Sequence, residues 1–417
     1  MAPLEGVKVL ELGHIVAGPS VGLILADLGA EVIKIEQPGQ GDASRNMPNF
    51  GSTFYFLNRN KRSLALDLKS AKGIEIFAEL MKKSDVVVDN FAPHQLDKWG
   101  IGYEWASELN PKIIYCSIKG FLPGPNQSRP FLDELAQMAA GLAFMTGPVG
   151  QPLRAGASII DIGAATYATL GILAALLERN STNKGQMITS GLFETAVFWV
   201  GQHTTRTQLT GKVPEPMLAR SMGGQMGWGV YQAFTTCDQR QIFIAVTSNK
   251  QWLGLCKALD LPELARDPTL QSNSQRVEAY DRITPIIAGA VSKLTYQEAS
   301  RKLADENLAY GPINNPREVL DDPHLSQSGF WMEIAPDGQT PLRVPKLPIH
   351  TKSDNFEVRS QPPQLGEHSR DILLEIGHSE AEIEEWEHSG IIQINGGMLK
   401  VEERNTTGDF SQKSTNS

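Results

Sequence analysis

Cysteine is scarce in this chain of 417 residues, and the scarcity limits what kind of protein it can be. The three cysteines, Cys116, Cys237 and Cys256, lie far apart and form no CxxC pair. A disulfide scaffold and a cysteine-ligated metal site both need more cysteines at closer spacing. The eight histidines show no HxxxH or similar pairing. We therefore expect reduced thiols, a cytoplasmic protein and no metal site.

Basic charge and long apolar runs are scarce as well. The 47 acidic and 38 basic residues leave a formal net charge of −9. Because nucleic-acid binding needs a dominant basic surface, we expect no nucleic-acid partner, although a local basic pocket for a small anion remains compatible. No apolar run reaches the roughly 18 residues of a membrane helix, and the N-terminus lacks the pattern of a signal peptide. We therefore expect no membrane segment.

The first half of the sequence alternates short apolar runs with helical periodicity. Helices are expected to follow the first strand through residue 28 and at residues 71–82 and 164–179. Strands are expected at residues 7–12, 31–36, 63–68, 85–90, 113–118 and 186–190. Alternating elements of this kind are typical of parallel βαβ units with helices on both faces. The pattern predicts an α/β fold whose large domain contains a Rossmann-like parallel sheet, with residues 1–203 as its N-terminal part.

The second half changes in composition near residue 204. Residues 204–229, rich in Gly, Pro and Met, are predicted to be a linker that carries a glycine loop. Residues 230–306 are predicted to form a smaller α+β domain, with a hairpin at 230–236 and 241–246 and helices at 251–259, 274–291 and 296–306. Residues 307–392 are interpreted as a return linker with the C-terminal part of the large domain, including a polar helix pair. Residues 393–417 have the composition of a disordered tail.

The first strand, loop and helix allow a dinucleotide-site interpretation. Gly13 and Gly18 follow the strand, and Glu36 ends the second strand, where dinucleotide-binding proteins place an acidic residue on the ribose. The GxGxxG spacing is absent, however, and Pro19 occupies the start of the helix. We therefore expect the doubly wound geometry without an NAD site.

Motifs that resemble one known family lie in order along nearly the whole chain, up to about residue 392. They include residues 10–13 (LELG), 17–20 (AGPS), 26–36 (ADLGAEVIKIE), 58–63 (NRNKRS), 88–91 (VDNF), 115–121 (YCSIKGF), 156–161 (GASIID), 171–177 (GILAALL), 311–314 (GPIN) and 365–368 (LGEH). This set resembles the family III CoA-transferases (the CaiB/BaiF family), which include formyl-CoA transferase and α-methylacyl-CoA racemase. The resemblance implies that an acyl-CoA and a small carboxylic acid are the substrates. It also implies that no cofactor is bound permanently and that two ring-shaped chains interlock as a homodimer.

The resemblance places the nucleophile at Asp161. Its carboxylate would attack the acyl-CoA thioester, and an aspartyl anhydride and then an aspartyl-CoA thioester would follow. The position before a long predicted helix agrees, because a helix N-terminus supplies partial positive charge to a carboxylate. Taken alone, an aspartate before a helix is more simply explained as an N-cap.

Further site residues follow from the same resemblance. The catalytic set includes Gly223, Gly224 and Gln225 of the glycine loop, whose backbone could approach the intermediate closely and offer N–H donors to an oxyanion. The alternative for this loop is an ordinary linker, and the alternative for each cation is a solvated surface charge. The implied contacts with CoA are Val16, Lys61, Arg62, Asn90, Lys98 and Lys119.

Substrate identity is less constrained by the sequence. We expect succinyl-CoA or another dicarboxylyl-CoA as donor, and its distal carboxylate would need a guanidinium partner, for which Arg154 and Arg220 are candidates. Asp133 and Gln137 are expected to support the site. A 2-methylacyl-CoA racemase needs an acid/base histidine where Leu132 stands, and a non-catalytic acyl-CoA-binding protein would be expected to lack Asp161. CoA transfer between the two carboxyls of one diacid stays an open alternative.

Overall fold

The computed structural model describes residues 2–47, 51–216, 227–338, 340–352 and 356–394. Its large domain is built on a seven-stranded sheet with the order β12-β3-β2-β1-β4-β5-β6. Six strands are parallel, and the short β12 (Ile392–Gln393) pairs antiparallel with β3 at one edge. The parallel strands are β1 (Lys8–Glu11), β2 (Glu31–Glu36), β3 (Lys61–Leu66), β4 (Val86–Asp89), β5 (Ile114–Lys119) and β6 (Gln186–Gly191). The order 3-2-1-4-5-6 is that of the doubly wound fold, so the predicted Rossmann-like sheet is confirmed.

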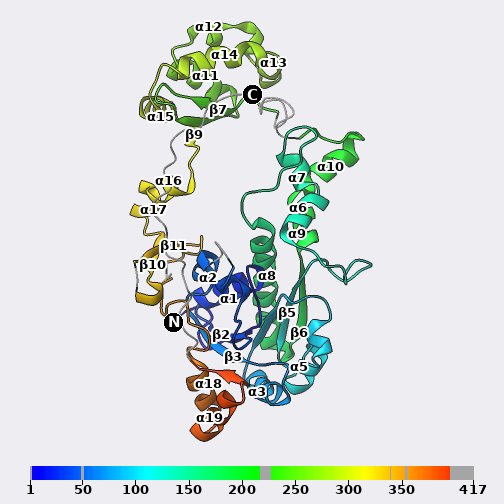
Figure 1. Ribbon diagram of the computed structural model, residues 1–417. Coiled ribbons are helices and arrows are strands. Elements are labelled where there is room, and N and C mark those ends of the chain that lie inside the picture. Colours follow the sequence, from blue (N-terminus) through cyan, green and yellow to red (C-terminus); the bar gives the residue numbers. More distant parts are fainter. Residues whose placement is uncertain (1, 48–50, 217–226, 339, 353–355, 395–417) are drawn as a thin grey trace, which may run out of the picture.

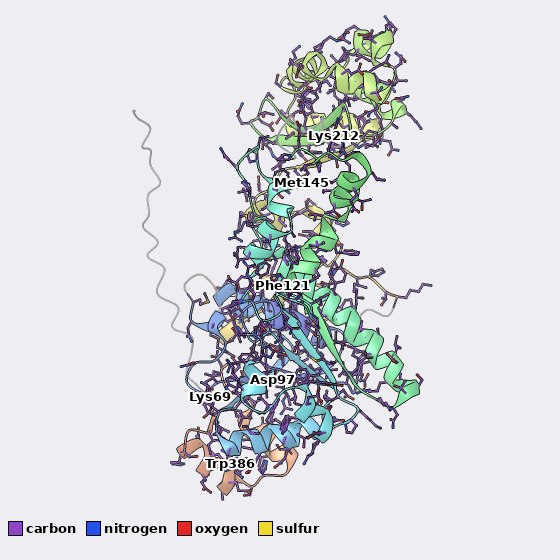
Figure 2. The ribbon with its side chains drawn as sticks, turned by 90° about the vertical axis from the view of Figure 1, so that its right-hand side faces the viewer. Lys69, Asp97, Phe121, Met145, Lys212 and Trp386 are labelled. Atoms are coloured by element: carbon purple, nitrogen blue, oxygen red, sulfur yellow. The ribbon has the colours of Figure 1, made fainter. Side chains whose placement is uncertain are left out.

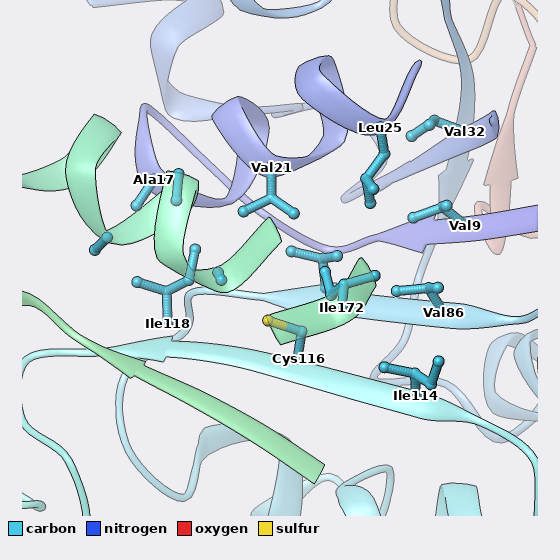
Figure 3. Close-up of a cluster of buried hydrophobic side chains, with 14 of the residues drawn as sticks. Val9, Ala17, Val21, Leu25, Val32, Val86, Ile114, Cys116, Ile118 and Ile172 are labelled. Atoms are coloured by element: carbon cyan, nitrogen blue, oxygen red, sulfur yellow. The ribbon is translucent and has the colours of Figure 1, made fainter. Parts of the chain in front are cut away.

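Helices cover both faces of this sheet because its strands bury side chains on both sides. On one face, α1 (Ala17–Asp27) and α8 (Ile159–Thr182) pack on strand residues such as Val9 and Val86. Figure 3 shows Val21 and Leu25 of α1 pointing toward these side chains. The opposite face, with Leu10 and Val87, is covered by α3 (Ala71–Lys82), α5 (Tyr103–Leu109), α18 (Ser369–Ile376) and α19 (Glu380–His388).

Helix α8 is longer and more apolar than the sequence analysis expected. It starts at Ile159 rather than near residue 164, and by length and composition it could cross a membrane. The expectation that no apolar stretch reaches this length was wrong, because Ile, Leu and Ala keep the mean hydropathy high although Asp161, glycine and threonine interrupt the run. In the fold, Ala164, Ala168, Ile172 and Ala175 bury one face of α8 against α1 and the sheet.

The chain leaves the large domain along one arm, forms a small domain and returns along another arm (Figure 1). The outgoing arm contains α6 (Asp133–Ala139), α7 (Leu142–Thr146), α9 (Leu192–Trp199) and α10 (Gly201–Thr210). The returning arm contains α16 (Pro316–Leu320), α17 (Pro323–Gln327), β10 (Trp331–Ile334) and β11 (Leu342–Pro345). Figure 2 shows that the small domain and the part of the large domain around Lys69, Asp97 and Trp386 lie at opposite ends of the molecule.

The small domain contains a three-stranded antiparallel sheet in the order β7-β8-β9. The predicted hairpin is confirmed as β7 (Val230–Thr235) and β8 (Gln241–Val246). The third strand, β9 (Ala309–Pro312), lies within the segment assigned to the return linker, so the sheet extends past residue 306. The helices are α11 (Asn249–Ala258), α12 (Pro262–Arg266), α13 (Asn273–Glu278), α14 (Tyr280–Val291) and α15 (Tyr296–Asp305). One predicted helix, at 274–291, is thus two, and α10 occupies the start of the predicted linker.

A buried ion network lies between α1 and the sheet. It consists of three acidic and three basic side chains, namely Glu11, Glu36, Asp42, Lys34, Arg45 and Lys61. Lys34 lies 2.8 Å from Glu11 and 2.9 Å from Asp42, Lys61 lies 2.6 Å from Glu11, and Arg45 lies 2.8 Å from Glu36. Buried charges are tolerated when each has a close opposite partner, and this network contains equal numbers of both signs. Helix α1 approaches so closely that a Cβ at Gly22 would lie 2.0 Å from Glu11 Oε2.

Replacement of Lys61 tests this network. The variant Lys61→Met leaves Glu11 with one cationic partner, so we expect the free energy of unfolding to fall by about 3 kcal/mol. The exposed Lys98, replaced in the same way, is the matched control and should change it by less than about 0.5 kcal/mol. Urea denaturation measures both. Equal stability of the two variants would contradict a structural role of Lys61.

Candidate active site

A crevice opens where the strand order reverses, between β1 and β4. In doubly wound sheets this is the point at which ligands bind, outside the carboxyl ends of the strands. A cavity of about 600 Å³ lies here. The loop after β1, the segment after β2, the end of β3 and the loop after β4 line it. Its lining includes Gly13, His14, Gln37, Asp42, Leu68, Lys69, Phe91, Gln95 and Trp99.

Asn90 connects the two loops that border the crevice. Its Oδ1 accepts a hydrogen bond from the backbone N–H of His14 at 2.8 Å, and its Nδ2 donates to the carbonyl of the same residue at 2.9 Å. The His14 ring packs against Phe91 with centroids 5.3 Å apart, and burial lowers its pKa, so the imidazole is neutral at pH 7. The amide of Asn90, expected to contact CoA, is therefore engaged with the protein backbone.

Glu36 shows why this crevice is not a dinucleotide site of the usual kind. Its carboxylate is buried and accepts hydrogen bonds from Arg45 Nε and Nη2, each at 2.8 Å, and from Ser63 Oγ at 2.7 Å. Burial alone would raise its pKa, but Arg45 outweighs burial and lowers it. The acidic group at the end of β2 is therefore engaged with Arg45 and Ser63 in this structure.

The four cations expected to contact CoA occupy different environments. Lys119, at the end of β5, forms an ion pair with Asp89, donates to the Phe91 carbonyl at 2.9 Å, and lines a second cavity of about 350 Å³ beside the crevice. Lys98 ends α4 (Gln95–Lys98) and is exposed. Arg62 forms a bidentate pair with Glu375 at 2.8 Å, near the amino end of the sheet.

Lys61 and Val16 are both buried. Lys61 has no exposed surface, and its ammonium group donates to the Pro19 carbonyl and to Asn58 at 2.9 Å. Lys61 therefore cannot touch a ligand in this conformation. The expected contact with CoA is not formed, and the side chain belongs to the buried ion network. Val16 precedes α1 and packs with Leu23 and Leu57.

Asp161 lies in the first turn of α8, and a second carboxylate caps that helix. Asp133 Oδ2 accepts hydrogen bonds from the backbone N–H groups of Ile160 at 2.7 Å and Asp161 at 3.1 Å. Gln137 donates to Asp133 Oδ1, and Gln137 Oε1 accepts from the Ala155 N–H at 2.9 Å. The N-cap alternative for Asp161 is therefore wrong, because Asp133 supplies the capping carboxylate and the Asp161 side chain is not used for it. The expectation that Asp133 and Gln137 support the site agrees with this geometry.

The surroundings of Asp161 raise its pKa to about 7. Burial is the main cause, and the carboxylates of Asp133 and Glu134 add to it. The expected stabilisation by the helix N-terminus is thus outweighed, since Asp133 already occupies the first N–H groups. Arg154, expected to bind a substrate carboxylate, lies 3.3 Å from Glu134 and is exposed. In its ionised form, a carboxylate of raised pKa is more basic and therefore more nucleophilic than an ordinary one, and about half of the Asp161 carboxyls are in this form near neutral pH.

The remaining predictions concern Arg220, the glycine loop, the position of Leu132 and the possible metal ligands. Arg220, Gly223, Gly224 and Gln225 lie outside the described part of the chain. Leu132 precedes α6 and is exposed. Within the described residues, no histidine is among the charged groups that shift the pKa of Asp161, and no cluster of three or more His, Cys, Asp or Glu side chains could hold a metal ion.

Lys34 and Asp42 were not among the residues expected at the site. Both contact the backbone of the loop after β1, through Gly13 and Ile15 respectively. A signal was present in the strand EVIKIE, because Lys34 lies between Ile33 and Ile35 in the middle of a strand that is expected to be buried, and a buried lysine needs an anionic partner. The sequence pattern does not indicate which acidic residue along the chain is that partner.

The doubly wound sheet, the crevice at its strand-order reversal and the carboxylate in the first turn of α8 place this chain among α/β proteins with a ligand site at the carboxyl edge of the sheet. The family model described as "CoA-transferase family III" matches residues 4–369 of this chain. The chain belongs to this family and is a CoA-transferase.

Named relatives and solved structures agree with this assignment. The chain is 35% identical to human succinyl-CoA:glutarate CoA-transferase, across 90% of this chain and 86% of the relative. It is 32% identical to formyl-CoA:oxalate CoA-transferase of Bradyrhizobium sp., across 93% of this chain and 97% of the relative. A CaiB/BaiF family protein from Brucella suis, 32% identical, superposes with a TM-score of 0.79 over 90% of this chain and 99% of that chain.

The raised pKa of Asp161 predicts a pH-dependent effect of Asp161→Asn on stability. In the folded protein this group binds its proton more tightly than in the unfolded chain. The free energy of unfolding of the wild type therefore falls as pH rises from about 4 to about 7. Asparagine does not titrate, so the gain in Tm of the variant over the wild type should be larger at about pH 8 than at about pH 5.5. Thermal unfolding at both pH values measures it, with the exposed Asp371→Asn as control. The same gain in Tm at both values would contradict the raised pKa.

Proposed function

We propose that this enzyme moves CoA from a dicarboxylyl-CoA, with succinyl-CoA as the first candidate, to a second carboxylic acid by covalent catalysis at Asp161. The observation that carries the proposal is the Asp161 carboxylate itself. It is half-buried in the first turn of α8, its pKa is raised to about 7, and its side chain is not used as the cap of α8. CoA would enter through the crevice between β1 and β4.

The reaction has two halves: the first transfers CoA from the donor to Asp161, and the second transfers CoA from Asp161 to the acceptor acid. An Asp161 oxygen attacks the thioester carbonyl, the C–S bond breaks, and CoA thiolate leaves a mixed anhydride. The thiolate then attacks the aspartyl carbonyl, which releases the donor acid as a carboxylate and leaves an aspartyl-CoA thioester. An acceptor carboxylate attacks that thioester and expels the thiolate. The thiolate finally attacks the acceptor carbonyl of the new anhydride, which yields the new acyl-CoA and the free Asp161 carboxylate.

The acidic surroundings of Asp161 favour the acylated state. Repulsion from Asp133 and Glu134 acts on the ionised carboxylate before reaction. Acylation converts this carboxylate to a neutral group and removes the repulsion. The repulsion thus raises the free energy of the reactant state more than that of the transition state, which lowers the barrier to nucleophilic attack. The hydrogen bonds from Ile160 and Asp161 to Asp133 keep the first turn of α8 in place during these steps.

The relatives support a dicarboxylate donor. Human and mouse succinyl-CoA:glutarate CoA-transferases are each 35% identical to this chain, and succinate–glutarate CoA-transferase of Agrobacterium fabrum is 31% identical. Formyl-CoA:oxalate CoA-transferases match at 31–32% identity. A free distal carboxylate needs a cation, and the exposed Arg154 beside Glu134 is the described residue we propose for it.

Trapping of the intermediate tests the mechanism. The enzyme is incubated with succinyl-CoA and then with hydroxylamine, which converts acyl-aspartate to a hydroxamate that mass spectrometry can locate. We expect the hydroxamate at Asp161, with none in Asp161→Ala and at least a 10³-fold loss of transfer activity in that variant, the order that loss of a nucleophile produces.

Two other results would contradict the proposal. An adduct on another residue would replace Asp161 as the nucleophile. Absence of any adduct, together with exchange of the α-proton of a 2-methylacyl-CoA in deuterated water, would indicate racemase chemistry. A panel of acceptor acids, with a doubly labelled diacid, then separates transfer between molecules from transfer within one diacid.

We also propose that the enzyme is a homodimer. Most of the exposed large apolar side chains in the described part of the chain lie between Leu122 and Val213, on α8 and the outgoing arm. Leu177 of α8 is 72% exposed and Phe198 of α9 is 71% exposed, while α10 has no buried residue. So many exposed large apolar side chains on neighbouring elements favour an interface with another chain. In Figure 1 the two arms run apart from one another between the large and the small domain, a course that would suit a second chain passing between them.

Substitution on this surface tests the dimer. We expect Phe198→Asp to shift the sedimentation coefficient from that of a dimer to that of a monomer, because a buried unpaired carboxylate at an interface weakens association by several kcal/mol. The exposed Leu374→Asp on α18, outside this surface, is the matched control and should leave the dimer intact. A monomeric wild type at micromolar concentration would contradict the proposal.

A further inference from the structure

Three consecutive residues of the loop after β1 are held by three polar side chains. Lys34 Nζ donates to the Gly13 carbonyl at 2.7 Å. Asn90 binds both backbone groups of His14, and Asp42 Oδ1 accepts from the Ile15 N–H at 3.0 Å. Gly13 and His14 line the cavity of the crevice. Every residue of this short segment is thus fixed through its backbone, which leaves the His14 side chain free to face the cavity.

The loop would not adopt this conformation unaided. Ile15 has φ of +63°, in the left-handed region that β-branched residues rarely occupy. Such a backbone persists only where surrounding contacts determine it, and strained residues of this kind cluster at ligand sites. The contact that holds Ile15 directly is its hydrogen bond to Asp42. The strain and the hydrogen bond together indicate that the position of this loop matters to the crevice.

Lys34 and Asp42 are suited to hold the loop because they hold one another. Their charged groups lie 2.9 Å apart and have no exposed surface. Asp42 also accepts from Ser44 N at 2.8 Å and Oγ at 2.7 Å, and Lys34 also donates to Glu11 at 2.8 Å. Burial opposes the charge on Lys34, but Asp42 and Glu11 outweigh it and raise its pKa. Both groups therefore stay ionised and fixed in direction around neutral pH.

We propose that Lys34 and Asp42 are positioning residues for the acyl-CoA substrate, which act by fixing the backbone of Gly13 and Ile15 at the edge of the crevice. This proposal rests on the proposed function, in that it takes CoA as the occupant of the crevice. Neither side chain needs to touch the substrate. Their effect is on binding, because they set the shape of the wall against which the substrate lies, while Asp161 performs the chemistry.

The test compares CoA affinity with stability and kcat. We expect Asp42→Ala to weaken binding of CoA, measured by calorimetry, and to raise KM for succinyl-CoA by about tenfold or more, since misplacement of a site wall by an ångström has effects of this size. KM for the acceptor acid and kcat at saturating succinyl-CoA should change less than about threefold. Asp42→Asn keeps an oxygen acceptor for the Ile15 N–H and should recover part of the affinity.

Ser63→Ala is the matched control. Ser63 is buried, donates to Glu36 of the same ion network and makes no hydrogen bond to the loop. We expect this variant to lower Tm and to leave CoA affinity unchanged. Loss of CoA affinity in Ser63→Ala equal to that in Asp42→Ala would overturn the proposal, because it would make affinity a consequence of general stability.

The double variant Ile15→Gly/Asp42→Ala covers the case in which Asp42→Ala does not fold. Glycine accepts the left-handed conformation without strain, so we expect Tm to recover while CoA affinity stays low. Recovery of affinity together with Tm would reduce Asp42 to a structural role and overturn the proposal. Trapping at Asp161 in the wild type separates failure of the positioning role from failure of the proposed function. An Asp161 adduct with unchanged affinity in the loop variants overturns only the positioning role, and a wild type that binds no CoA overturns both.

Discussion

The pairing of Lys34 with Asp42 and Glu11, deep between α1 and the sheet, is the interaction on which the crevice depends. A buried cation in the second strand would be strongly destabilising alone, and it obliges two acidic residues from different segments to converge on it. One of these acidic residues is on β1, which places that strand beside β2. The other follows β2 and reaches the loop after β1 through its second oxygen. The same ion pairs that join β1 to β2 therefore also shape the ligand-binding edge.

The environment of Asp161 shows a second use of buried carboxylates. Asp133 caps α8 from a neighbouring helix, and Gln137 fixes Asp133 in turn. The cap stabilises the start of the long helix, and its negative charge adds to the effect of burial, the main cause, in raising the pKa of Asp161. Stability and reactivity are opposed here, since a carboxylate near other carboxylates is costly in the folded state and more nucleophilic for the same reason.

Much of the fold could be predicted from the sequence, and the reasons are local. The strand at 31–36 and the helix at 71–82 were predicted to the residue, because β-branched alternation and helical periodicity with a serine cap are properties of contiguous residues. The start of α8 was misplaced because its cap comes from Asp133, 28 residues before Asp161. Strand β9 was assigned to a linker because its partner, β8, lies more than 60 residues earlier.

The sequence by itself determined the family, the α/β class, the order of the parallel strands along the chain and the residue expected to act as nucleophile, since each is carried by short motifs or by periodicity. Only the tertiary structure decided which charges are available to a ligand. Lys61 and Asn90 look like binding residues in the motif, yet the fold engages them with Glu11 and His14. Lys34 and Asp42 do not look like binding residues in the sequence, yet both contact the loop at the crevice. The physical reason is that a charge buried by folding must find its partner in space, and the distance along the chain does not specify where that partner lies.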